Sequence, residues 1–140
     1  MNTITATALR IGQSNINGAG MGLFTDEKIL KGKKVVKYMG ELFNNINQCD
    51  FQSAYCFAPN SSNIIDASMD TKKIENSGRF INTARNSNYK NNTKWGKKIY
   101  FCSENNAYYV WIYASRNIKS GEELFIPYGR SYTLFSETSK

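Results

Sequence analysis

The sequence predicts a mainly β protein that folds as one domain. Its 140 residues are enough for one compact core and too few for two. Hydrophobic residues make up 41% of the chain and aromatic residues 14%, so it carries enough apolar side chains to fold despite its many asparagines. Short runs of β-branched and aromatic residues alternate with turn residues, which is typical of strands joined by tight connections.

Six short segments are predicted as strands, in chain order: residues 23–24, 35–39, 64–67, 99–103, 107–114 and 123–126. The pair Asn105-Asn106 tolerates positive φ, which predicts a hairpin between the fourth and fifth of these strands. The run Lys119-Ser120-Gly121 predicts another turn before the sixth. Residues 44–53 are the best candidate for a short helix. No internal repeat and no linker rich in Pro or Gly divides the chain.

The charged and sulfur-bearing residues limit the chemistry that the chain can perform. It has no histidine, which excludes Ser-His-Asp and Cys-His catalysis. Cys49, Cys56 and Cys102 form no CxxC pair, so we expect three buried free thiols and no metal site. With no long apolar run and no secretory start, an intracellular protein without a membrane span is expected.

The net charge of +7 is concentrated in two groups of lysines, at residues 28–37 and 90–98. Such groups attract nucleic acid or another anionic surface without specifying which. A solvated basic face with no partner is an equally open interpretation.

Four motifs stand out, although each alone fits a turn or a core strand. In NGAGMGLF (17–24), alternate glycines expose the backbone, but the spacing is not that of the nucleotide-binding GxGxxG. In RFIN (79–82), the apolar Phe80 and Ile81 draw Asn82 inward, where its amide either joins two loops or binds a polar ligand. The others, YMGE (38–41) and GEELFIPYG (121–129), each contain a tyrosine within or at the end of a strand.

Taken together and in this order, the four motifs resemble the SET domain of protein lysine methyltransferases. Tyr55-Cys56-Phe57, Ile65-Asp66-Ala67 and residues 114–118 extend the resemblance, which runs from about residue 7 to residue 132. It implies a single SET domain across residues 1–140, with a short tail at 133–140. The implied fold has several small twisted sheets around a pseudoknot crossing, in which the RFIN segment passes beneath the final tyrosine motif.

The resemblance also implies a cofactor, S-adenosylmethionine, and the residues that bind it. The backbone of Gly20, Met21 and Gly22 would face its methionine end. Asn82 would bind it through the side-chain amide, and the backbone of Thr83 would meet the adenine. In place of a cysteine-rich tail, either Phe135 would cover the adenine or a partner would complete the site. Arg79 would brace the segment.

By the same resemblance, the substrate lysine enters a narrow aromatic channel on the opposite face. Tyr128 and Tyr38 match the catalytic and channel tyrosines, and the implied wall residues are Tyr38, Tyr55, Trp95, Ile126 and Tyr128. The amine must be neutral to attack the sulfonium methyl, and desolvation beside a cation lowers its pKa from about 10.4. Aligning the two reactants can contribute roughly 7–11 kcal/mol.

The sequence departs from the family at two places. Thr83-Ala84-Arg85 replaces the usual His-Ser-Cys, a form that resembles the PR-type branch. Ile126 stands where the family often has Tyr or Phe, and the smaller side chain favours di- or trimethylation.

The implied substrate is a histone tail lysine, which places the protein in the nucleus on chromatin. Its basic patches would contact nucleosomal DNA, an acidic groove using Asp66, Asp70 and Glu75 would take the tail, and a homodimer would be a further possibility. Three alternatives stay open: a methyltransferase of a non-histone protein, a catalytically silent SET-like module that binds a protein, and a nucleic-acid-binding domain that stacks bases on aromatics. Tyr109, Trp111 and Tyr113 alternate along one predicted strand, as core aromatics would, which argues against the last.

Overall fold

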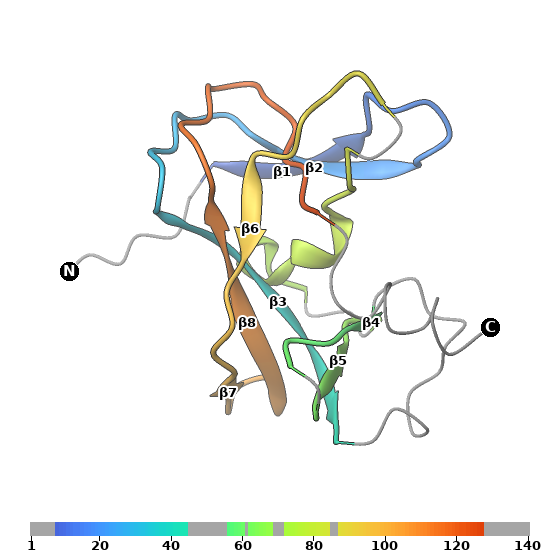
Figure 1. The fold of residues 1–140 in the computed structure, drawn as a ribbon, viewed down its shortest axis with the longest axis vertical. Helices are drawn as coiled ribbons and strands as arrows, with labels where there is room; N and C mark the ends of the chain where they lie inside the picture. The colour runs from blue at the N-terminus through green and yellow to red at the C-terminus, as the bar shows by residue number, and fades with distance from the viewer. Residues whose placement is uncertain (1–7, 45–55, 61, 69–71, 85–86, 128–140) are drawn as a thin grey trace.

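The computed structural model describes residues 8–44, 56–60, 62–68, 72–84 and 87–127 of the chain (Figure 1). In this part the protein is mainly β, as predicted, and its helical turns are two short 3-10 helices. The strands are β1 (Leu9–Gln13), β2 (Met21–Thr25), β3 (Lys34–Phe43), β4 (Cys56–Phe57), β5 (Ile64–Asp66), β6 (Thr93–Trp95), β7 (Tyr100–Cys102) and β8 (Ala107–Ala114). The 3-10 helices are η2 (Ile74–Asn76) and η3 (Gly78–Phe80).

The strands form two antiparallel sheets. β1 and β2 pair as a two-stranded sheet, which lies across one end of the molecule (Figure 1). The larger sheet has the order β4-β5-β3-β8-β6, and β7 also pairs with β8. The two 3-10 helices follow β5 and contact β3, so they carry the chain from the larger sheet towards β2.

The core lies on one face of β3 and β8, the two longest strands. Val110, Ile112 and Ala114 are fully buried there, as is Val36 of β3. The expectation that Tyr109, Trp111 and Tyr113 are core side chains is confirmed for Trp111, which is 8% exposed, and wrong for the two tyrosines. All three lie on the other face, where Tyr109 and Tyr113 are half-buried, because the strand alternates and the aliphatic set faces inward.

Five of the six predicted strands are present, within a few residues of the expected ends, and β3 is longer than expected. The turns at Asn105-Asn106 and Lys119–Gly121 are also confirmed, with positive φ at Asn106 and Gly121. The sequence did not indicate β1, β4 or β6. The helix expected at residues 44–53 lies almost wholly outside the described residues.

The sixth predicted strand is not a regular strand, because residues 121–126 change partner midway. The backbone first bonds to β2 through Gly121, Glu122 and Leu124. Directly after Leu124, Phe125 forms a parallel bridge with Asn82, and the Ile126 amide donates to the Asn82 carbonyl at 2.9 Å. This segment, red in Figure 1, therefore links the small sheet to the RFIN segment.

Two smaller expectations concern the burial of the cysteines and the absence of a membrane span. Cys56 and Cys102 are half-buried rather than buried, and Cys49 lies outside the described residues. No helix in the described part of the chain is long and apolar enough to cross a membrane.

The close approach of β3 to β5 depends on Gly40. A Cβ built on Gly40 would overlap the carbonyl oxygen of Asp66 and lie 2.7 Å from the Cα of Ala67. Because both obstacles are backbone atoms, the two strands would have to separate. Gly40→Ala should therefore lower the free energy of unfolding by about 3 kcal/mol or more, measured by urea denaturation.

Gly12→Ala is the matched control, since its Cβ would meet side-chain atoms of Arg10 and Phe24 at 3.4 Å and beyond. This variant should unfold within about 1 kcal/mol of wild type. Equal losses in the two glycine variants would contradict the packing argument.

Candidate functional site

Asn82 joins three of the motifs singled out in the sequence. Its side-chain Nδ2 donates to the carbonyl of Met21 at 2.9 Å, which ties the RFIN segment to the glycine-rich loop. Its backbone carbonyl accepts from the amide of Ile126, which ties the same segment to GEELFIPYG. The sequence left open whether this amide joins loops or binds a ligand, and the geometry shows that it does join them.

The glycine-rich loop presents an open backbone next to Asn82. Gly20 has a φ of 74° and a Cβ placed on it would meet no atom within 4 Å. Met21 is 49% exposed. Gly22 differs, since it is buried and a Cβ there would overlap the carboxylate of Glu123. Gly20 and Met21 therefore face open space, whereas Gly22 makes room for a buried acid.

Glu123 holds the start of the glycine-rich loop. Its carboxylate accepts from the hydroxyl of Ser14 and from the backbone amide of Asn15, both at 2.7 Å. The residue is 3% exposed, and bonds from donors of this kind compensate for the burial of a charge. Sequence reasoning missed Ser14 and Glu123. The signal available was the second Glu of GEEL, which falls within an otherwise apolar run.

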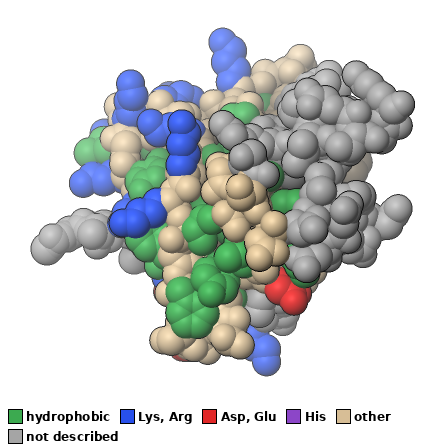
Figure 2. All heavy atoms as spheres, turned by 60° about the horizontal axis from the view of Figure 1, so that its bottom comes forward, with side chains coloured by type: hydrophobic (Ala, Val, Ile, Leu, Met, Phe, Trp, Pro, Cys, Tyr) green, Lys and Arg blue, Asp and Glu red, His purple; other side chains and the backbone are tan. Residues whose placement is uncertain are grey.

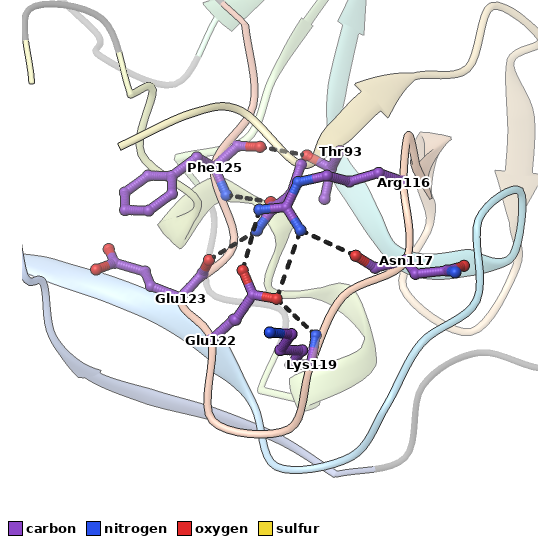
Figure 3. A network of polar contacts seen from close by, with 8 residues as sticks. Thr93, Arg116, Asn117, Lys119, Glu122, Glu123 and Phe125 are labelled. Atoms are coloured by element: carbon purple, nitrogen blue, oxygen red, sulfur yellow. Dashed lines mark hydrogen bonds and ion pairs between the residues drawn. The ribbon is translucent and has the colours of Figure 1, made fainter. Parts of the chain in front are cut away.

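Asn92 fastens the final segment from the opposite side, and sequence reasoning missed it too. Its Nδ2 donates to the carbonyl of Glu123 at 3.0 Å, and its Oδ1 accepts from the amide of Phe125 at 2.8 Å. Thr93 adds a hydroxyl bond to the Phe125 carbonyl, seen in Figure 3. The Asn92 side chain is almost fully buried. Its two bonds satisfy backbone groups that a neighbouring strand would otherwise satisfy. Among so many asparagines, no local pattern distinguished this one.

A charged cluster closes the turn that precedes this segment (Figure 3). The Glu122 carboxylate accepts from the Arg116 guanidinium at 3.0 Å and from the Lys119 amide at 2.6 Å. Partial burial favours the neutral acid, but these bonds outweigh it and hold the pKa of the Glu122 carboxyl below its usual value.

Three aromatic rings meet beside the end of the described chain. Phe57 and Trp95 are stacked with centroids 3.7 Å apart, and Tyr38 lies edge-on to Trp95 at 5.0 Å. The indole Nε1 of Trp95 donates to the carbonyl of Pro127 at 2.9 Å. Trp95 therefore anchors the residue that immediately precedes Tyr128.

The expected channel residues are placed only in part. Tyr38, Trp95 and Ile126 belong to one apolar cluster, and Phe57 joins them although it was not predicted. Alternation along a strand places residues 55 and 57 on one face, which is the signal that could have identified Phe57. Tyr55, Tyr128 and Phe135 lie outside the described residues, and Thr83 is half-buried directly after Asn82. Arg79 donates to the carbonyl of Ser68 at 2.7 Å, the bracing contact expected of it.

Comparison with known proteins identifies the family. The model of the SET domain matches residues 20–129, so the chain belongs to the SET domain family. A Plasmodium falciparum protein named as a histone-lysine N-methyltransferase is 33% identical over 148 residues, covering 100% of this chain. The chain spans 2% of the length of that relative.

Solved structures agree with the family. A Polycomb Repressive Complex 2 in an autoinhibited conformation, bound to S-adenosylmethionine, matches with a TM-score of 0.64 and 27% identity over 96% of this chain. A humanized mutant of the Chaetomium thermophilum complex, bound to an inhibitor, matches with a TM-score of 0.65 and 26% identity over 91%. This chain covers 17% and 15% of those two chains. The predicted SET fold is confirmed.

Replacing the buried amide of Asn92 should be costly. In Asn92→Asp the donor that meets the Glu123 carbonyl becomes an acceptor, and a charge is buried with it. We expect a loss of about 3 kcal/mol or more in the free energy of unfolding, measured by urea denaturation. Asn88→Asp makes the same chemical change at an exposed position and should cost less than about 0.5 kcal/mol. Similar losses at both positions would contradict the role of Asn92.

The Arg116–Glu122 pair predicts a dependence on pH. Because the folded pKa of Glu122 is depressed, its contribution to stability is present above the unfolded value of about 4.3 and is lost as the pH falls through the folded value. A double-mutant cycle with Arg116→Gln and Glu122→Gln should give a coupling below about 1 kcal/mol at neutral pH, since both groups are partly exposed. The coupling should decline below pH 4, roughly. A coupling equal at pH 7 and in acid would contradict this assignment.

Proposed function

We propose that this chain is an S-adenosylmethionine-dependent protein-lysine N-methyltransferase, with one SET domain whose core spans about residues 7–132. The observation that carries the proposal is the junction at Asn82, whose side-chain amide bonds to the exposed glycine-rich loop and whose backbone carbonyl bonds to Ile126 in the final segment. Membership of the SET domain family supports the reaction class.

The residues at the junction fit S-adenosylmethionine. The open backbone at Gly20 and Met21 can accept the polar methionine end, and the Asn82 amide lies next to it. Thr83 and Phe135 are proposed for the adenine side, and a structural neighbour is bound to this cofactor. When bound, the cofactor supplies a methyl group activated by its sulfonium.

The protein's own task is to deliver a neutral, aligned lysine amine. The rings of Tyr38, Phe57 and Trp95 exclude water, which disfavours the ammonium and lowers its pKa. A ring face also attracts the cationic product of the transfer. The bond from Trp95 to Pro127 fixes the residue that precedes Tyr128 in the chain, and the hydroxyl of Tyr128 is proposed to orient the amine. Tyr128 and Tyr38 are the proposed catalytic pair, and Tyr55 is proposed as a further wall.

We propose a histone tail as the substrate and chromatin in the nucleus as the location, because the curated relative is named for histone lysines. The expected acidic groove needs revision. Asp66 is 8% exposed and its carboxylate accepts from the Ser68 amide, so it is not open to a basic tail, whereas Glu75 is exposed and lies 3.9 Å from Lys37. Asp70 lies outside the described residues. A homodimer stays a proposal.

Transfer should be tested with labelled S-adenosylmethionine, core histones and recombinant nucleosomes, comparing wild type with Tyr128→Phe. We expect label on a protein lysine and its loss by at least roughly 100-fold in the variant, because the hydroxyl acts on the amine in the transition state. Mass spectrometry of the product should show di- or trimethyl-lysine, since Ile126 is smaller than the aromatic residues common at its position; monomethyl product alone would refute that part.

Asn82→Ala should weaken cofactor binding measured by calorimetry, whereas Asn88→Ala, at an exposed position, should bind as wild type does. Wild-type protein that neither binds the cofactor nor transfers a methyl group would overturn the proposal in favour of a silent binding module. Cofactor binding with label on non-histone lysines only would retain the enzyme and reject the histone.

A further inference from the structure

The outer face of the central sheet has a regular pattern that the proposed reaction does not use. Tyr109, Trp111 and Tyr113 alternate along β8 on the face away from the core. On one side of this row β3 carries Lys34 opposite Tyr113, and on the other side β6 carries Lys94 opposite the same tyrosine. Directly paired residues share a face of a sheet, so lysines flank the aromatic row on both sides.

The ammonium groups of Lys34 and Lys98 lie over aromatic rings. The Nζ of Lys34 lies 4.9 Å from the ring centroid of Trp111. Tyr100 of β7 stacks on Tyr109 at 5.3 Å, and the Nζ of Lys98 lies 5.2 Å from the Tyr100 ring. We call this set the lysine–aromatic face: Lys34, Lys94, Lys98, Tyr109, Trp111 and Tyr113. Because each strand is about 4.8 Å from its neighbour and β3 and β6 lie on either side of β8, the backbones of Lys34 and Lys94 lie about 10 Å apart.

Acidic groups occupy one edge of this face. Lys37 also lies over Tyr109 and Trp111, at 4.8 and 5.3 Å, but Glu75 of η2 is 3.9 Å from its ammonium. Lys73 and Glu104 pair at 2.8 Å beside the β7–β8 turn. In the described part of the chain, the salt bridges leave Lys34, Lys94 and Lys98 for an outside anion. Figure 2 views the molecule from the β7 end, where hydrophobic side chains lie at the surface with basic ones beside them and few acidic ones.

We propose that the lysine–aromatic face binds the backbone phosphates of double-stranded DNA. Three ammonium groups gathered on one face of a sheet complement the dense negative charge of a duplex. The rings are not available for stacking on bases, since Trp111 is 8% exposed, Tyr109 is covered by Tyr100, and lysines lie over the rings. A single strand held by base stacking is therefore disfavoured. The inference goes beyond methyl transfer and does not depend on it.

The test measures binding of a labelled duplex of about 25 base pairs by fluorescence anisotropy, without cofactor, between roughly 50 and 200 mM salt. The face variant Lys34→Gln/Lys94→Gln/Lys98→Gln is compared with the control Lys72→Gln/Lys73→Gln/Lys119→Gln. Both remove three positive charges, but the control lysines lie exposed on connecting loops. We expect the face variant to bind at least about tenfold more weakly at low salt, and its log–log salt slope to fall by roughly 2–3, while the control changes little.

Equal losses in the two triple variants would overturn the proposal, because they would mean diffuse attraction by the net charge. Tighter binding of a single strand of the same length, or equal binding of poly-glutamate, would overturn it as well. Because Lys34 packs on Trp111, a second variant guards against misfolding: Lys94→Glu changes an exposed side chain and should alone weaken duplex binding at an unchanged melting temperature. Unaltered binding in Lys94→Glu would contradict the assignment.

Discussion

The backbone of residues 123–127 crosses from one sheet to another segment, and a side-chain amide makes the crossing possible. A strand that leaves its partner exposes N–H and C=O groups, which must be satisfied when they are buried. Asn92 supplies a donor to Glu123 and an acceptor to Phe125 at that point, almost fully shielded from water. At the next residue, the backbone carbonyl of Asn82 accepts a hydrogen bond from the amide of Ile126. This crossing brings three segments together: the glycine-rich loop, the RFIN segment and the last described residues.

The same crossing explains why a buried acid and a glycine occur together. The backbone carbonyl of Glu123 accepts from the Asn92 side chain, and its carboxylate accepts from Ser14 at the start of the glycine-rich loop. Gly22 has no side chain because that carboxylate occupies the space. One residue therefore fixes both the crossing and the loop, and the open backbone at Gly20 and Met21 is presented on a rigid base. A site built in this way is preorganised by polar contacts more than by apolar packing.

The sheet face and the crossing perform separate tasks. The core side of β8 is aliphatic and supports Tyr38 and Trp95, whereas its outer side holds lysines over aromatic rings. A basic surface on this face would bring the protein to an anionic assembly without occupying the proposed lysine channel. The two faces of a single strand can thus be altered independently.

The sequence by itself determined the mainly β class, the turns at Asn106 and Gly121, and the four motifs, because these depend on local backbone preferences and on the order of short segments. It also indicated that Asn82 would be drawn inward. The tertiary structure alone decided which asparagine fastens the crossing, why Gly22 is required, and that Phe57 rather than a neighbour stacks on Trp95. It also placed the aliphatic side chains of β8 in the main core and left Tyr109 and Tyr113 half-buried on the other face. These depend on contacts between residues up to about a hundred positions apart, which no local pattern records, and alternation along a strand does not say which of its two faces is the inner one.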